Sequence, residues 1–176
     1  MREAVICEPL RTAVGGFGGM YRDVPVTVLA RTVIEELVRR TSLPSEAIED
    51  VILGQGYPNG EAPALGRVAA LDAGLGKEVP GMQVDRRCGA GLQAIMLGCM
   101  KVQTGAADLV LAGGAESMSQ AEARFRSSPS APTPVRVRRS PAGQRPGNSP
   151  SMSTSGRGGR LAVWTARVSR PALCAA

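Results

Sequence analysis

The order of apolar and polar residues predicts alternating strands and helices over residues 1–122. Four short apolar runs suit buried strands: Ala4–Cys7, Val51–Gly54, Gly81–Asp85 and Leu109–Ala112. Three longer stretches repeat apolar residues every three or four positions, as amphipathic helices do: 26–40, 63–73 and 88–104. Gly105 is a suitable stop for the last helix, and 43–48 is expected to form a connector with a short helical turn.

Strand–helix alternation of this kind requires crossover connections, which join parallel strands and cover both faces of their sheet. The chain is therefore predicted to be an α/β protein, with a mixed, mostly parallel sheet and helices on both faces.

The pattern stops after Glu122, and the charge changes at the same place. Residues 1–122 hold 11 of the 21 basic side chains and all 15 acidic ones, whereas 123–176 hold ten arginines, no lysine and no acid. Ser, Pro, Arg, Ala and Gly dominate from 127 to 160, without apolar periodicity. Such a segment buries too little apolar surface to offset the entropy of ordering it. We therefore expect one domain at 1–122 and a disordered tail at 123–176.

One cysteine lies where chemistry is expected. In Val84-Asp85-Arg86-Arg87-Cys88-Gly89-Ala90-Gly91, a strand ends, two cationic residues follow, and Cys88 opens a helix whose first turn is small. Unpaired N–H groups at a helix N-terminus favour the thiolate and can stabilise an oxyanion, so the layout suits nucleophilic acyl transfer. The alternative is that Cys88 is a small buried apolar residue at a tight turn.

This segment resembles the nucleophile motif of the thiolase family. Further resemblances occur in the same order along the chain: Arg11-Thr12-Ala13-Val14-Gly15 with Phe17-Gly18-Gly19, Val51-Ile52-Leu53-Gly54-Gln55, Ala64-Leu65-Gly66-Arg67-Val68-Ala69-Ala70 and Ala112-Gly113-Gly114-Ala115-Glu116-Ser117-Met118-Ser119. Two residues depart from the usual motif, Asp85 where Asn is common and Ala90 where Ser or Thr is common.

The resemblance implies the N-terminal half of an acetyl-CoA C-acyltransferase, an enzyme class of fatty acid metabolism. It implies Cys88 as the acylated nucleophile, with its own backbone N–H as an oxyanion donor. Coenzyme A thioesters and CoA are then substrates, no separate cofactor is needed, and the complete family protein is expected to be a homo-oligomer. An activating histidine and a second cysteine come from the C-terminal half in such enzymes. The chain has no histidine, and Cys174 lacks the Cys-x-Gly setting of that second cysteine.

The chain is therefore expected to be truncated and inactive on its own. Residues 123–176 are interpreted as an out-of-frame translation of a GC-rich coding region, with a genuine disordered basic tail as the alternative. A non-catalytic thiolase-like fragment, a basic-tailed binding protein and a ketosynthase-type condensing enzyme stay open as other functions.

Several other classes of protein are disfavoured. The lack of histidine and of paired cysteine spacing argues against a metal site. No N-terminal signal or membrane-length apolar run is present, so a cytoplasmic protein without membrane association is expected. The arginine-rich tail permits nonspecific contact with nucleic acid, but no stacking platform indicates a specific nucleic-acid partner.

Overall fold

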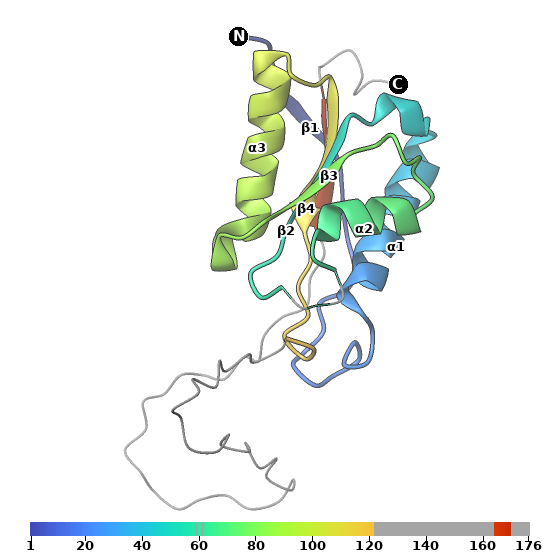
Figure 1. The fold of residues 1–176 in the computed structure, drawn as a ribbon, viewed down its shortest axis with the longest axis vertical. Coiled ribbons are helices and arrows are strands. Elements are labelled where there is room, and N and C mark those ends of the chain that lie inside the picture. The colour runs from blue at the N-terminus through green and yellow to red at the C-terminus, as the bar shows by residue number, and fades with distance from the viewer. Residues whose placement is uncertain (59, 61, 122–163, 170–176) are drawn as a thin grey trace, which may run out of the picture. The chain divides into compact units, whose positions relative to one another are not determined.

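A computed structural model describes residues 1–58, 60, 62–121 and 164–169 of the chain (Figure 1). The elements, in chain order, are β1 (Val5–Arg11), α1 (Val26–Thr41), η1 (Ser45–Ala47), β2 (Asp50–Gly54), α2 (Leu65–Asp72), β3 (Gly81–Val84), η2 (Arg87–Gly89), α3 (Ala90–Thr104), β4 (Leu109–Gly114) and β5 (Trp164–Ser169). The elements η1 and η2 are single 3₁₀ turns. Every strand and helix predicted within residues 1–122 is present, with ends that differ by a few residues.

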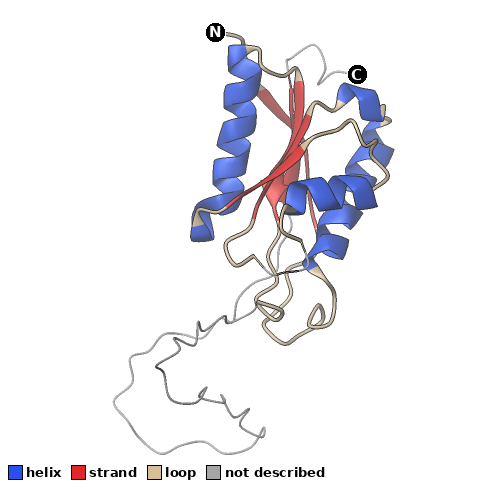
Figure 2. Cartoon of the chain, in the orientation of Figure 1, coloured by secondary structure: helices blue, strands red, loops and turns tan. Residues whose placement is uncertain are grey.

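The strands form one mixed sheet in the order β1-β5-β4-β2-β3. The pairs β2/β3 and β2/β4 are parallel, while β5 lies antiparallel between β1 and β4. The strands β1 to β4 therefore run in one direction and only β5 opposes them. Helices α1 and α2 cover one face and α3 covers the other (Figure 2). The predicted α/β class, with a mostly parallel sheet and helices on both faces, is confirmed.

Alternation along the central strands divides the interior into two apolar clusters. Successive side chains of a strand point to opposite faces, so Val51 and Leu53 of β2 pack with α1 and α2, whereas Ile52 packs with α3. The five residues of β2 are all buried, which explains why this strand reads as a continuous apolar run rather than as an alternating one.

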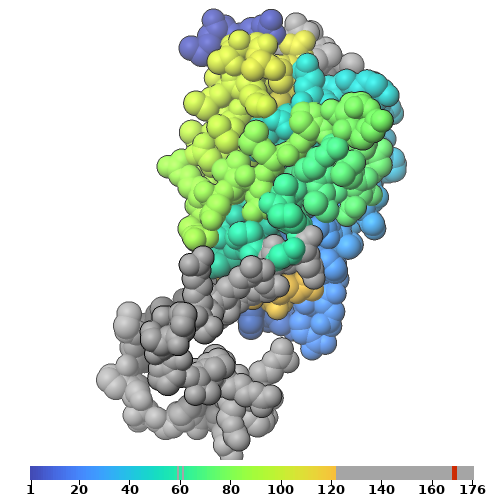
Figure 3. Space-filling model, viewed as in Figure 1, coloured from blue at the N-terminus to red at the C-terminus, as the bar shows by residue number. Residues whose placement is uncertain are grey.

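The helix α3 turns its small side chains inward and its large ones outward. Ala90, Ala94, Gly98 and Val102 are its buried positions. Leu92, Met96 and Met100, three of the apolar residues whose spacing predicts this helix, are 66%, 46% and 54% exposed. The prediction gave the helix correctly but did not identify which face packs on the sheet. In the space-filling view, α3 lies along the outside of the described part of the molecule (Figure 3).

The strand β5 corrects the sequence analysis, which expected no ordered structure after Glu122. It places Val168 at 0% exposure in the α3-side cluster and pairs along the whole of β4. The remainder of the predicted tail, 123–163 and 170–176, lies outside the described residues. Among the helices that the structure describes, none is long and apolar enough to cross a membrane.

Candidate active site

Cys88 lies in the 3₁₀ turn η2, directly before α3, and its thiol is free and exposed. It borders a pocket of about 420 Å³ formed where β2 and β4 end against the first turns of α3. The lining residues come from those three places: Gly54, Gly56, Arg87, Cys88, Ala90, Gly91, Leu92, Ile95, Gly114, Ala115 and Glu116. The exposed position excludes the alternative in which Cys88 is a small buried apolar residue.

Glycines let α3 approach the sheet closely at this pocket. A Cβ on Gly54 would lie 2.2 Å from the carbonyl carbon of Ala90, and a Cβ on Gly114 would lie 3.0 Å from Cα of Gly91. The distance at Gly54 is shorter than real Cβ contacts, so only glycine fits there, while the distance at Gly114 is shorter than most such contacts and favours glycine. The first turn of α3, and Cys88 before it, are therefore seated directly on the carboxyl ends of β2 and β4.

The turn that carries Cys88 contains an unusual backbone conformation. Arg87 has φ of 49°, a left-handed value that non-glycine residues adopt rarely and at a cost. Asp85 supports this conformation with both carboxylate oxygens, since Oδ1 accepts from the N–H of Arg87 at 2.9 Å and Oδ2 accepts from its Nη1 at 2.8 Å. An asparagine has only one side-chain oxygen, so the aspartate makes one acceptor contact more than the usual residue of the motif.

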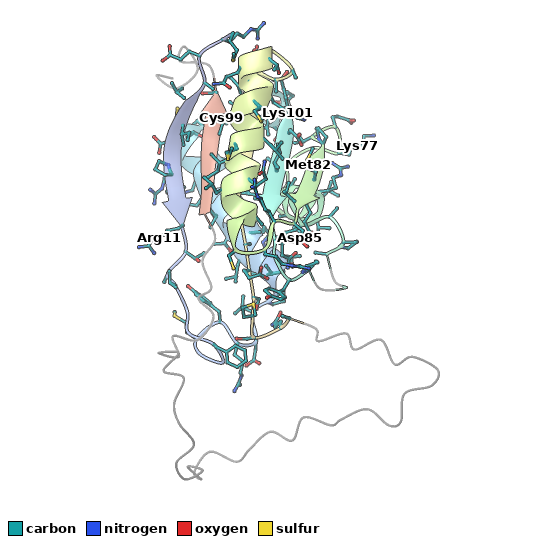
Figure 4. The ribbon with its side chains drawn as sticks, turned by 90° about the vertical axis from the view of Figure 1, so that its left-hand side faces the viewer. Arg11, Lys77, Met82, Asp85, Cys99 and Lys101 are labelled. Carbon is teal, nitrogen blue, oxygen red and sulfur yellow. The ribbon has the colours of Figure 1, made fainter. Side chains whose placement is uncertain are left out.

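The two arginines before Cys88 have different partners. Arg86 Nη1 donates along α3 to Oε1 of Gln93. Arg87 Nη1 donates to the carbonyl oxygen of Gly56 at 2.5 Å, and its guanidinium group lies 5.6 Å from the ring centroid of Tyr57. Arg87 thus ties the turn of Cys88 to the loop that follows β2. Figure 4 shows Asp85 close to the N-terminal end of α3, next to this turn.

The N–H groups of the turn are not all used internally. Gly89 donates to the carbonyl of Arg86 at 3.1 Å, and Ala90 donates to the carbonyl of Arg87. Within the described part of the chain, no oxygen accepts a hydrogen bond from the N–H of Cys88. This N–H therefore has no internal partner among the described residues, which is one requirement for an oxyanion donor.

Glu116, just after β4, lines the pocket. The sequence placed it in a motif but did not predict it as a site residue. Its Oε2 accepts from the N–H of Gly56 at 2.7 Å and from the N–H of Tyr57 at 3.1 Å. Its Oε1 is enclosed and has no hydrogen-bond partner among the residues that the structure describes. The sequence signal was an acid two residues after an apolar strand that ends in Gly-Gly. Ligands often bind at this end of the strands in α/β sheets.

The other motif segments converge on this pocket to different degrees. Those that end β2 and β4 line it directly. The 11–19 segment does not line it, but the N–H of Gly18 donates to Oγ of Ser119 at 2.9 Å and so joins it to the segment after β4.

The remaining cysteines lie away from the pocket. Cys7 is buried in β1, where its Sγ is 3.9 Å from Oγ of Ser169. Cys99 is half-buried on α3, and burial raises the pKa of its thiol. Cys174 lies outside the described residues. No group of three potential metal ligands occurs in the part of the chain that the structure describes.

Residues 4–139 match the family model described as the thiolase N-terminal domain. The chain belongs to the thiolase family. This match extends beyond the boundary predicted at residue 122.

Relatives of the thiolase domain agree with this assignment. Proteins named "Probable acetyl-CoA acyltransferase" from Staphylococcus aureus strains NCTC 8325 and MRSA252 are each 40% identical to this chain over 120 residues, which is 68% of this chain and 30% of theirs. The crystal structure of the Bacillus anthracis acetyl-CoA acetyltransferase is similar with a TM-score of 0.71 and 33% identity, over 76% of this chain and 35% of that one. The chain thus spans about a third of the length of these relatives.

Proposed function

We propose that Cys88 is the nucleophile of an acyl transfer that uses coenzyme A thioesters. The observation that carries the proposal is the position of this free, exposed thiol at the start of α3, beside a pocket and a backbone N–H without an acceptor. The acyltransferase names of the relatives support the choice of substrate.

In this reaction the sulfur of Cys88 attacks the thioester carbonyl carbon, and the negative charge moves to the carbonyl oxygen. The N–H of Cys88 donates to that oxygen while the tetrahedral intermediate exists. The intermediate then collapses, the bond to the CoA sulfur breaks, and CoA leaves as a thiol after taking up the proton lost by Cys88. The product is an acyl group attached to Cys88 through a new thioester bond.

We propose that this chain lacks the base that the reaction needs for a high rate. The 176 residues contain no histidine, and a positioned general base typically contributes about 10²–10⁴-fold in rate. We therefore propose that the base, and the second cysteine implied by the family, belong to polypeptide beyond these residues. The isolated chain is expected to accept acyl groups slowly and not to complete a catalytic cycle.

The experiment is acetyl transfer from acetyl-CoA to the purified chain, with the modified residue located by peptide mass spectrometry. Met100→Cys, made in a second sample, places an exposed thiol on the same helix outside the pocket lining, and it reports uncatalysed thioester exchange. We expect Cys88 to be acetylated faster than the introduced thiol, and Cys88→Ala to remove the faster reaction. Equal rates at the two positions would show that Cys88 has no special role, and would favour a non-catalytic fragment.

A further inference from the structure

A chain of contacts connects Glu116 to Cys88 although the two residues lie on different elements. Glu116 accepts from the N–H groups of Gly56 and Tyr57 through the same oxygen, Oε2. These two consecutive N–H groups fix the direction of the backbone in the loop after β2, because both must point at one atom.

The same two loop residues hold the turn before α3. The carbonyl of Gly56 accepts from Arg87, and the ring of Tyr57 lies under its guanidinium group. Gly56 also lies directly against this turn, since a Cβ on it would be 3.0 Å from the carbonyl oxygen of Arg87. A shift of the loop therefore moves Arg87.

Arg87 in turn determines where the next residue points. Its φ of 49° is a strained value for a non-glycine residue, and such values persist only where the surroundings enforce them. If the contacts to the loop are lost, the hydrogen bonds to Asp85 are the support that remains, so the turn can shift and the thiol and N–H of Cys88 can change direction.

We propose that Glu116 is a positioning residue for Cys88, acting through the loop after β2 and through Arg87. The inference deepens the proposed function and rests on it, because positioning matters only if Cys88 accepts an acyl group. Glu116 does not touch the reacting atoms in this role.

The charge of Glu116 is not what the role requires. Both N–H groups use Oε2, while Oε1 is buried and has no partner within the described ranges. A glutamine provides one equivalent oxygen, which is sufficient for both bonds, whereas a leucine of similar size provides none. Glu116→Gln and Glu116→Leu therefore form a matched pair that separates the hydrogen bonds from the shape of the side chain.

The experiment measures two rates in the full 176-residue chain: acetyl transfer from acetyl-CoA to Cys88, and alkylation of Cys88 by iodoacetamide. Acyl transfer needs an aligned sulfur and an oxyanion donor, whereas alkylation needs an accessible thiolate but no oxyanion donor. We expect Glu116→Leu to lower acetyl transfer by about tenfold, a modest part of what misplacement of a reacting group can cost. Its effect on alkylation should be smaller than its effect on acetyl transfer, because alkylation does not use the oxyanion donor. Glu116→Gln should recover most of the lost transfer.

A second variant, at Arg87, tests whether Glu116 acts on Cys88 through Arg87. This test does not require Glu116→Leu to fold well. The Arg87 side chain is 65% exposed, so Arg87→Ala should leave the fold intact while breaking the link to Gly56. We expect it to lower acetyl transfer as well, and the double variant with Glu116→Leu to be no slower than the slower single variant.

The outcomes separate the two proposals. Unchanged transfer in Glu116→Leu or in Arg87→Ala, equal losses in the leucine and glutamine variants, or losses that multiply in the double variant would each overturn the positioning role while leaving Cys88 as the acceptor. If the wild-type chain shows no preference for acetylation at Cys88, the proposed function fails and the positioning role fails with it.

Discussion

Replacing Gly54 with alanine should displace Cys88 and the first turn of α3 more than the same replacement at Gly114. The new Cβ would lie 2.2 Å from C of Ala90, 2.4 Å from its O and 2.4 Å from N of Gly91. Ordinary contact begins at 3.4 Å, so the first turn of α3 would have to move by the difference, at least about 1.2 Å. All three atoms are backbone, and no side-chain rotation can relieve the overlap.

The cost can be set from these distances. Inserting a methyl group into a filled interior typically costs about 1–3 kcal/mol, and a site bounded by backbone belongs at the upper end, about 3 kcal/mol. Gly114→Ala meets Gly54 O at 2.9 Å and Gly91 Cα at 3.0 Å, so it should cost less. Gly16→Ala is the control, because nothing lies within 4 Å of its added Cβ and a surface change of this kind stays within about 0.5 kcal/mol.

Urea denaturation followed by circular dichroism measures these differences, and acetyl transfer to Cys88 measures the displacement of α3. We expect the order Gly16→Ala, Gly114→Ala, Gly54→Ala for the loss in free energy of unfolding, with acetyl transfer falling in the same order. A Gly54→Ala chain as stable as the Gly16→Ala control, with acetyl transfer unchanged, would refute the close approach of α3 to β2.

Three other predictions concern α1 and α3. Hydrogen bonds from Arg39 and Arg40 lower the pKa of Glu36 from 4.5 to about 2. The stability that these bonds add is therefore present above pH 4.5 and is lost as the pH falls towards 2. The free energy of unfolding measured over this range should show the loss, and Glu36→Gln should remove that part of the acid dependence. Burial raises the pKa of Cys99, so its alkylation rate, followed by mass spectrometry, should reach half its maximum above pH 9.0, the value for a solvated thiol; a midpoint at or below 9.0 would contradict this. Replacing Leu92 and Met96 with glutamine should reduce self-association in sedimentation experiments without lowering the unfolding midpoint, because both side chains are exposed; a lower midpoint would show that they are packed.

The sequence was sufficient for features that depend on local pattern. The helix predicted over 26–40 is α1, Val26–Thr41, and apolar residues at the predicted spacing, such as Leu29, Val33 and Leu37, are buried. Gly105 ends α3 with φ of 78°, as expected for a glycine stop. The position of Cys88 before α3 was also readable, because a strand, a tight turn and a helix follow one another within a few residues.

Features that depend on distant contacts were not readable. Apolar spacing alone does not show which side of α3 packs on the sheet. The glycines at the strand ends allow the side with Ala94 and Gly98 to pack there, so Leu92 is exposed. The hydrogen bonds of Glu116 join residues about 60 positions apart. A local pattern carries no information about such a pairing.

The strand β5 was missed for a related reason. Its residues, Trp164–Ser169, follow an arginine- and serine-rich segment and are too few to predict a strand by themselves. They form a strand because β1 and β4 offer unpaired backbone groups on both sides. Predicting this from the sequence would have required knowing that a gap exists between these two strands.

The measurement that tests the proposed role of Cys88 most directly is labelling by a haloacyl-CoA, compared with labelling by iodoacetamide in parallel samples. The ratio of Cys88 to Cys99 modification with iodoacetamide reports only exposure and thiol reactivity, which differ between the two sites. If the pocket beside Cys88 receives coenzyme A thioesters, the same ratio should be higher with the haloacyl-CoA, and free CoA should reduce it. An identical ratio with the two reagents, unaffected by CoA, would contradict a role for Cys88 in acyl transfer.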